Sequence, residues 1–114
     1  EDMGRRDAAA WGPALIQHGV PMEVSTATGL NPRTAIGQCA DGSVLFLVLD
    51  GRYPSSLGAT YADMISILME YGAVNACNLD GGFSSVLLYE GERISDVASI
   101  ENIRKIPTAF MVRR

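Results

Sequence analysis

The stretch that decides the fold is residues 44–79, which read VLFLVLDGRYPSSLGATYADMISILMEYGAVNACNL. It opens with the uninterrupted apolar run Val44–Leu49, continues in a helical pattern over about residues 60–71, and closes with the apolar segment Ala73–Leu79. A strand, a helix and a strand in succession form a crossover unit whose two strands run parallel. Because Val44–Leu49 has no polar alternation, we expect it to be a central strand covered on both faces.

Local signals mark both ends of the predicted helix. Thr60 and Asp63 have the spacing of a capping box, in which a hydroxyl and a carboxylate satisfy free amides of the first turn. Gly72 is suited to the left-handed position that ends many helices. The polar stripe is expected to face solvent and the apolar stripe to face the sheet; the apolar residues are Tyr61, Met64, Ile65, Leu68 and Tyr71.

Further strands are predicted on both sides of this unit. Asp41-Gly42, between two apolar segments, predicts a β-hairpin that joins Arg33–Ala40 to the strand beginning at Val44. The other expected strands are Pro13–Gln17, Ser85–Tyr89 and an antiparallel closing strand at Pro107–Val112. We therefore predict an α+β fold with a single domain over residues 11–114, built on a mixed β-sheet and one crossover helix, after a lead-in segment at residues 1–10.

Composition excludes several classes of protein. With 114 residues, 47% of them hydrophobic, the chain can form one core and is not disordered. The net charge of −4 argues against a nucleic-acid partner, because phosphate binding needs a cationic surface. The apolar run at Val44–Leu49 is far shorter than the roughly 20 residues of a membrane span. Cys39 and Cys77 lie in strand-like segments and are expected to be free thiols.

The predicted topology brings polar residues to one edge of the sheet. Asp50 and Asp80 follow the two parallel strands, and Arg33 begins the strand that returns to the same edge. Arg52 and the serines after Asp80, Ser84 and Ser85, belong to this edge as well. Each has a structural alternative, since Asp-Gly is an ordinary turn sequence and Arg52 could neutralise Asp50. The glycines at the same places, Gly51, Gly81 and Gly82, would let backbone amides approach an anion.

Such an edge suits a substrate that carries both a sugar and a phosphate. Arginine binds phosphate oxygens through paired hydrogen bonds, and a carboxylate can attack an oxocarbenium-like carbon or activate water for that attack. A divalent metal held by Asp50 and Asp80 is a less favoured alternative, because two carboxylates make an incomplete ligand shell. We therefore predict no resident metal or cofactor.

Three segments, in this order, resemble the signatures of the phosphodiester glycosidase family. They are residues 31–37 (NPRTAIG), residues 50–52 (DGR) and residues 78–85 (NLDGGFSS). The family includes the enzyme that uncovers mannose 6-phosphate, and its bacterial members are often described as exopolysaccharide-biosynthesis proteins. The resemblance extends over roughly residues 11–112 and implies that this chain is the C-terminal part of the family's domain.

The resemblance implies hydrolysis of a glycosyl phosphodiester, such as an N-acetylglucosamine-1-phosphodiester, to free sugar and a phosphomonoester. It implies Asp80 and Asp50 as catalytic residues, and as substrate-binding residues Arg33, Arg52, Thr34, Asn78, Gly81, Gly82, Ser84 and Ser85. The expected partner is a sugar phosphate or polysaccharide, and the implied location is exported, cell-surface or luminal. An exposed sheet edge would also favour a homodimer. The alternative function is a non-catalytic glycan- or phosphate-binding module, or an assembly fragment.

Overall fold

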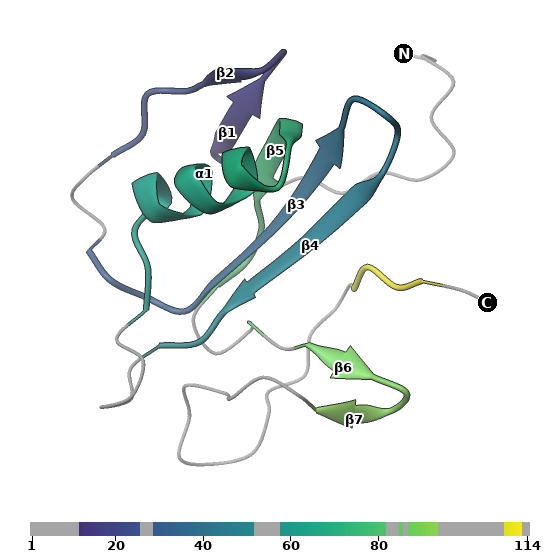
Figure 1. The fold of residues 1–114 in the computed structure, drawn as a ribbon. Helices are drawn as coiled ribbons and strands as arrows, with labels where there is room; N and C mark the ends of the chain where they lie inside the picture. The colour runs from purple at the N-terminus through teal and green to yellow at the C-terminus, as the bar shows by residue number, and fades with distance from the viewer. Residues whose placement is uncertain are drawn as a thin grey trace, which may run out of the picture.

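The computed structural model describes residues 12–25, 29–51, 58–81, 85, 87–93 and 109–112. Within them, five strands form one sheet in the order β2-β1-β5-β3-β4, and the helix α1 packs against one face of it (Figure 1). The elements are β1 Ala14–Gln17, β2 Val20–Pro21, β3 Arg33–Cys39, β4 Val44–Leu49, α1 Tyr61–Glu70, β5 Ala73–Asn78, β6 Leu88–Tyr89 and β7 Glu92–Arg93. β6 and β7 form a separate two-stranded hairpin. The α+β fold class predicted from the sequence is confirmed.

Both ends of α1 are as predicted. The Thr60 hydroxyl accepts a hydrogen bond from the Asp63 amide at 3.1 Å, and the Asp63 carboxylate accepts one from the Thr60 amide at 2.9 Å. The backbone and hydroxyl hydrogen bonds from Thr60 hold the pKa of Asp63 below its ordinary value. At the other end, Gly72 has a φ of +86° and donates its amide to the Met69 carbonyl.

β3 and β4 form the predicted hairpin. Their register places Arg33 opposite Leu49 at the open end of the hairpin. At the closed end, the Asp41 carboxylate accepts a hydrogen bond from the Ser43 amide at 2.9 Å, which stabilises the turn and lowers the pKa of Asp41.

The sheet is antiparallel, which corrects the mixed sheet expected from the sequence. β3 lies between β4 and β5 and is antiparallel to both of them. The two strands of the crossover therefore run in the same direction, as predicted, but they do not pair with each other. As a consequence, the end of β4, the start of β3 and the end of β5 all lie at one end of the sheet.

α1 packs on a floor of small side chains. The core between helix and sheet consists of Leu15, Ile16, Ala35, Met64, Ile65, Leu68, Ala73 and Ala76. At Gly37, a Cβ atom would lie only 3.2 Å from Cδ2 of Leu68. Small residues on β3 and β5 therefore allow the helix to approach the sheet closely. Larger side chains on α1 and β1 fill the space between the helix and the sheet.

β4 is an edge strand, which corrects the expectation of a central strand covered on both faces. Leu45, Leu47 and Leu49 are half-buried against the core, whereas Val44 and Phe46 are 58% and 40% exposed. An uninterrupted apolar run does not distinguish an edge strand from a central strand. β3 occupies the central position because it pairs on both sides, and α1 lies over β1, β3 and β5.

Three smaller expectations are also corrected. Tyr71 is 69% exposed instead of buried, because it is the C-cap residue at which the helix ends. The strand expected from Ser85 to Tyr89 is limited to β6, and residues 109–112 of the expected closing strand are in no strand. The rest of that closing strand, residues 107–108, and the lead-in at residues 1–10 lie outside the described residues.

The expectation of free cysteines is confirmed. Cys39 and Cys77 form no disulfide, and both are half-buried. Burial raises the pKa of the Cys77 thiol, as expected for a small apolar side chain on the sheet.

Candidate functional site

Pro32, which directly precedes β3, is the point on which the surrounding loops pack. A Cβ atom on Gly51 would lie 2.8 Å from the Pro32 nitrogen, and one on Gly81 would lie 2.8 Å from the Pro32 oxygen. A Cβ on Gly58 would lie 2.6 Å from the carbonyl carbon and oxygen of Asn31. The loops after β4, before α1 and after β5 therefore approach the Asn31–Pro32 backbone more closely than any side chain would allow. Glycine at positions 51 and 81 is explained by this packing without reference to an anion.

Asp50 and Asp80 lie on opposite sides of Pro32. Each directly precedes one of the glycines that pack on Pro32, Gly51 and Gly81. Both aspartates are half-buried, and both belong to the same end of the sheet, as the sequence predicted. Because β3 separates their strands, their Cα atoms are about two strand spacings apart, roughly 9–10 Å.

Arg33 is buried at the start of β3, with 7% of its surface exposed. Its Nε donates to the Ala59 carbonyl at 2.9 Å and its Nη2 to the Gly29 carbonyl at 3.0 Å. Its guanidinium carbon lies 4.3 Å from the centre of the Tyr61 ring, a cation–π distance. Ala59 also exchanges two backbone hydrogen bonds with Asn31, at 3.2 and 2.9 Å. Arg33 therefore joins the loop before β3 to the start of α1.

Asn78, at the end of β5, has an unsatisfied acceptor. The residue is 4% exposed, and its Nδ2 donates to the Gly12 carbonyl at 2.9 Å. Its Oδ1 is buried and has no hydrogen-bond partner in the described part of the chain. A buried acceptor of this kind costs about 1–3 kcal/mol, and proteins tend to retain such a cost at functional sites.

The predicted site residues divide between the two faces of the sheet. Arg33 and Asn78 lie on the α1 side, since they share the faces of the core residues on β3 and β5. Thr34 lies on the opposite face because side chains alternate along a strand, and its hydroxyl donates to that of Ser85 at 2.9 Å. Ser85 is 1% exposed. The sheet end therefore gathers these residues without placing them all in one cleft.

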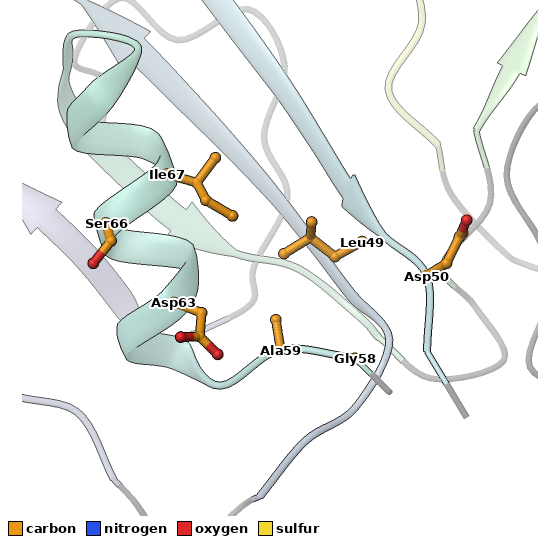
Figure 2. Close-up of a pocket in the computed structure, with 7 residues that line it drawn as sticks. All are labelled: Leu49, Asp50, Gly58, Ala59, Asp63, Ser66 and Ile67. Carbon is orange, nitrogen blue, oxygen red and sulfur yellow. The ribbon is translucent and has the colours of Figure 1, made fainter. Parts of the chain in front are cut away.

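A depression of about 380 Å³ lies beside this end, between α1 and the end of β4. It is lined by Leu49, Asp50, Gly58, Ala59, Asp63, Ser66 and Ile67. Figure 2 shows the Leu49 and Ile67 side chains directed toward each other, whereas the Asp50 carboxylate points away from the helix. The other acid in this depression, Asp63, is engaged in the capping box. The depression is therefore mainly apolar and is not the place where the predicted acids meet.

Three predicted site residues, Arg52, Gly82 and Ser84, lie outside the described residues. Sequence reasoning missed the roles of Ala59 and Tyr61, which contact the Arg33 guanidinium. No local pattern connects Arg33 with Ala59 and Tyr61, which lie more than 25 positions away. The one available signal is the capping box at Thr60, which places Tyr61 at the start of α1. Within the described segments, no group of three or more His, Cys, Asp or Glu side chains could hold a metal ion.

Comparison with known proteins identifies the family. Residues 1–113 match the sequence profile described as phosphodiester glycosidase. The chain belongs to the phosphodiester glycosidase family. The resemblance seen in the three sequence segments is thereby confirmed.

The chain spans less than a fifth of the length of the similar proteins described next. The prophage-derived protein YomE of Bacillus subtilis strain 168, described as uncharacterized, is 38% identical over 100 residues, which are 83% of this chain and 16% of YomE. A solved structure from Burkholderia pseudomallei K96243, named as a candidate exported protein, is 36% identical with a TM-score of 0.63, over 66% of this chain and 14% of that chain. A solved structure from Synechocystis, of a protein called hypothetical, is 29% identical with a TM-score of 0.64, over 76% of this chain and 18% of that one.

Membrane insertion through a helix finds no support in the described part of the structure. No helix there is both apolar enough and long enough to cross a bilayer.

Proposed function

We propose that the sheet end around Pro32 forms part of the active site of a hydrolase that cleaves glycosyl phosphodiesters. The observation that carries the proposal is the placement of the two Asp-Gly pairs, 50–51 and 80–81, on either side of Pro32 in a member of the phosphodiester glycosidase family. Because β4 and β5 both pair with β3, the turns that follow them flank its start, and each turn contributes one half-buried aspartate there.

In the proposed reaction, water forms a bond to the anomeric carbon and the bond from that carbon to the phosphate oxygen breaks. One carboxylate, Asp80 or Asp50, accepts the proton of the attacking water, and the phosphate leaves as a monoester. A phosphate is a weak base and needs charge neutralisation more than protonation. The stereochemical outcome reports the separation of the two carboxyl groups: inversion corresponds to about 6.5–9.5 Å between them, and retention to about 5–5.5 Å.

The arginines then have different roles. Arg33 is buried, and its hydrogen bonds to Ala59 and Gly29 go to backbone carbonyls. We propose that it positions the loops of the site and contributes a fixed positive charge near the phosphate. Direct contact with the phosphate is assigned to Arg52, which follows Asp50-Gly51 in the sequence.

The test is release of free sugar from an N-acetylglucosamine-1-phosphodiester. We expect Asp80→Asn and Asp50→Asn to lower the rate by about 10²-fold or more. Asp41→Asn is the matched control, since Asp41 is an exposed carboxylate in the turn at the opposite end of β4. Rates for Asp50→Asn and Asp80→Asn that equal the rate for Asp41→Asn would refute the assignment of the two aspartates as catalytic residues.

A binding module without catalysis is the second candidate. It is favoured by the division of the described site residues between the two faces of the sheet, which does not place them in one cleft. Calorimetry distinguishes the two functions: binding of the phosphodiester without release of sugar would support the module. We also propose an exported location, on the basis of the name of the Burkholderia relative, and fractionation of cells that produce the protein tests it.

A further inference from the structure

The two edges of the sheet differ in how they meet solvent. β2, at one edge, has two residues and ends in Pro21, which has no backbone amide to offer a further strand. β4, at the other edge, has six residues, all of them apolar, with no proline and no charged side chain. Short strands and proline protect an edge from pairing, whereas a long apolar strand invites it. The β4 edge lacks every one of these protections.

The register of the hairpin shows which backbone groups this edge presents. The Cys39 amide donates to the Ser43 carbonyl at 2.8 Å, so these two residues form a hydrogen-bonded pair. Such pairs alternate along an antiparallel ladder, and residues 45, 47 and 49 therefore bond to β3. The amides and carbonyls of Val44, Phe46 and Val48 point away from the sheet.

The sequence of β4 is symmetric about one of these residues. Residues 44–48 read Val-Leu-Phe-Leu-Val, a palindrome centred on Phe46. If two copies of β4 pair antiparallel about a two-fold axis at Phe46, each outward residue meets an outward residue: Phe46 faces Phe46, and Val44 faces Val48. On the other face, Leu45 meets Leu47. Each of the hydrogen-bonded pairs exchanges two backbone hydrogen bonds, and no charge is placed against another.

The side chains beside this edge are also open to a partner. Val44 and Phe46 are 58% and 40% exposed on one face, and the leucines of the α1 face are only half-buried. Phe110 contacts Phe46, with ring centres 6.3 Å apart, but residues 109–112 form no strand on β4. The contact covers part of one face and leaves the backbone edge unpaired among the described residues.

We propose that this chain forms a symmetric homodimer in which β4 pairs with β4 of a second copy about Phe46. The two sheets then form one continuous sheet. The same register places Gly42 of the second copy opposite Asp50, so that its hairpin turn lies beside the end of the sheet described above. The proposal rests on the strand edge and is independent of the reaction.

Sedimentation velocity over a series from about 10 μM to about 1 mM tests the association. The wild-type chain is expected to convert from monomer to dimer within this series. Val44→Lys is expected to weaken association by about tenfold or more, because it places a hydrated charge on the edge. Val20→Lys is the matched control, since Val20 is 60% exposed on the opposite edge, and it is expected to leave association unchanged.

A cysteine at the symmetry axis tests the register without relying on loss of folding. Phe46→Cys places two thiols in one cross-strand pair, with Cα atoms about 5.5 Å apart, within reach of a disulfide. Oxidation is expected to give a covalent dimer, whereas Val44→Cys, which faces Val48, is expected to give little.

Several outcomes would overturn the proposal. These are a wild-type chain that is monomeric throughout the series, dimerisation lost in Val20→Lys but kept in Val44→Lys, and equal cross-linking of the two cysteine variants. A monomer whose β4 edge is instead paired with another polypeptide segment would also overturn it.

Discussion

Replacing Gly58 by alanine would force a Cβ atom to within 2.6 Å of both the carbonyl carbon and oxygen of Asn31. The contacted atoms are backbone, so they cannot move aside as the end of a side chain could. Gly58 also has a φ of +102°, which strains any residue with a Cβ. Steric overlap and backbone strain together are expected to cost about 2–5 kcal/mol.

Two further glycines make the prediction quantitative. Gly81→Ala meets the Pro32 oxygen at 2.8 Å without a positive φ, and we expect it to cost about 1–3 kcal/mol. Gly12→Ala is the control, because no atom lies within 4 Å of its added Cβ and its φ is not positive. Its expected effect ranges from none to a stabilisation of about 1 kcal/mol.

Urea unfolding followed by circular dichroism measures all three free energies. The melting temperature of the Gly58→Ala variant should fall by roughly 10–20 °C, since about 1 kcal/mol corresponds to about 4 °C in a domain of this size. The expected order of stability is Gly12→Ala, then Gly81→Ala, then Gly58→Ala. Equal stability of the three variants would refute the close packing of the loops on Asn31 and Pro32, and with it the convergence of the two aspartates.

Three other predictions concern single elements. Thr60→Ala should cost about 1 kcal/mol in urea unfolding. The folded state lowers the pKa of Asp63, so the ionised carboxylate stabilises the fold above the unfolded pKa of 3.8, and this stabilisation should be lost as pH falls through the folded pKa. A cost of Thr60→Ala that stays constant down to low pH would contradict this. Val48→Ala, on the half-buried edge strand, should cost about 1 kcal/mol, whereas Leu15→Ala, at a fully buried position, should cost about 2–5 kcal/mol. If calorimetric melting shows Val48→Ala to be the more destabilising of the two, the edge position of β4 is contradicted. Arg33→Ala should cost about 3–5 kcal/mol, because it removes two hydrogen bonds made by a buried charged group and an aromatic contact. A stability close to wild type in chemical denaturation would show that Arg33 is not structural.

Much of the candidate site could be predicted because its members adjoin predictable elements. The Asp-Gly turn at 41–42 and the capping box at Thr60 identify the hairpin and the helix, and the order of elements then fixes the direction of each strand. The positions of Asp50, Asp80 and Arg33 follow from strand direction alone, since Arg33 begins β3 and the aspartates lie one and two residues after β4 and β5. Their common end of the sheet was therefore predictable without any long-range contact.

The partners of these residues were not predictable. The sequence did not indicate that Arg33 would contact Ala59, Gly29 and Tyr61, because these contacts depend on where α1 begins relative to β3. The sequence also did not indicate that Gly51 and Gly81 would pack on the backbone of Pro32. In both cases the residue type was informative, but the group that it meets is distant in sequence.

The amino-acid order alone determined the identity and direction of the hairpin strands, the helix with both its caps, and the family to which the chain belongs. These properties depend on neighbours within a few residues, which the sequence contains directly. Only the tertiary structure decided that β3 pairs on both sides, that β4 is left at the edge, and which face of the sheet each polar group occupies. The pairing of β3 with β5 joins residues about 40 positions apart, and it is selected by the packing of α1 on small side chains, a contribution that no local pattern contains.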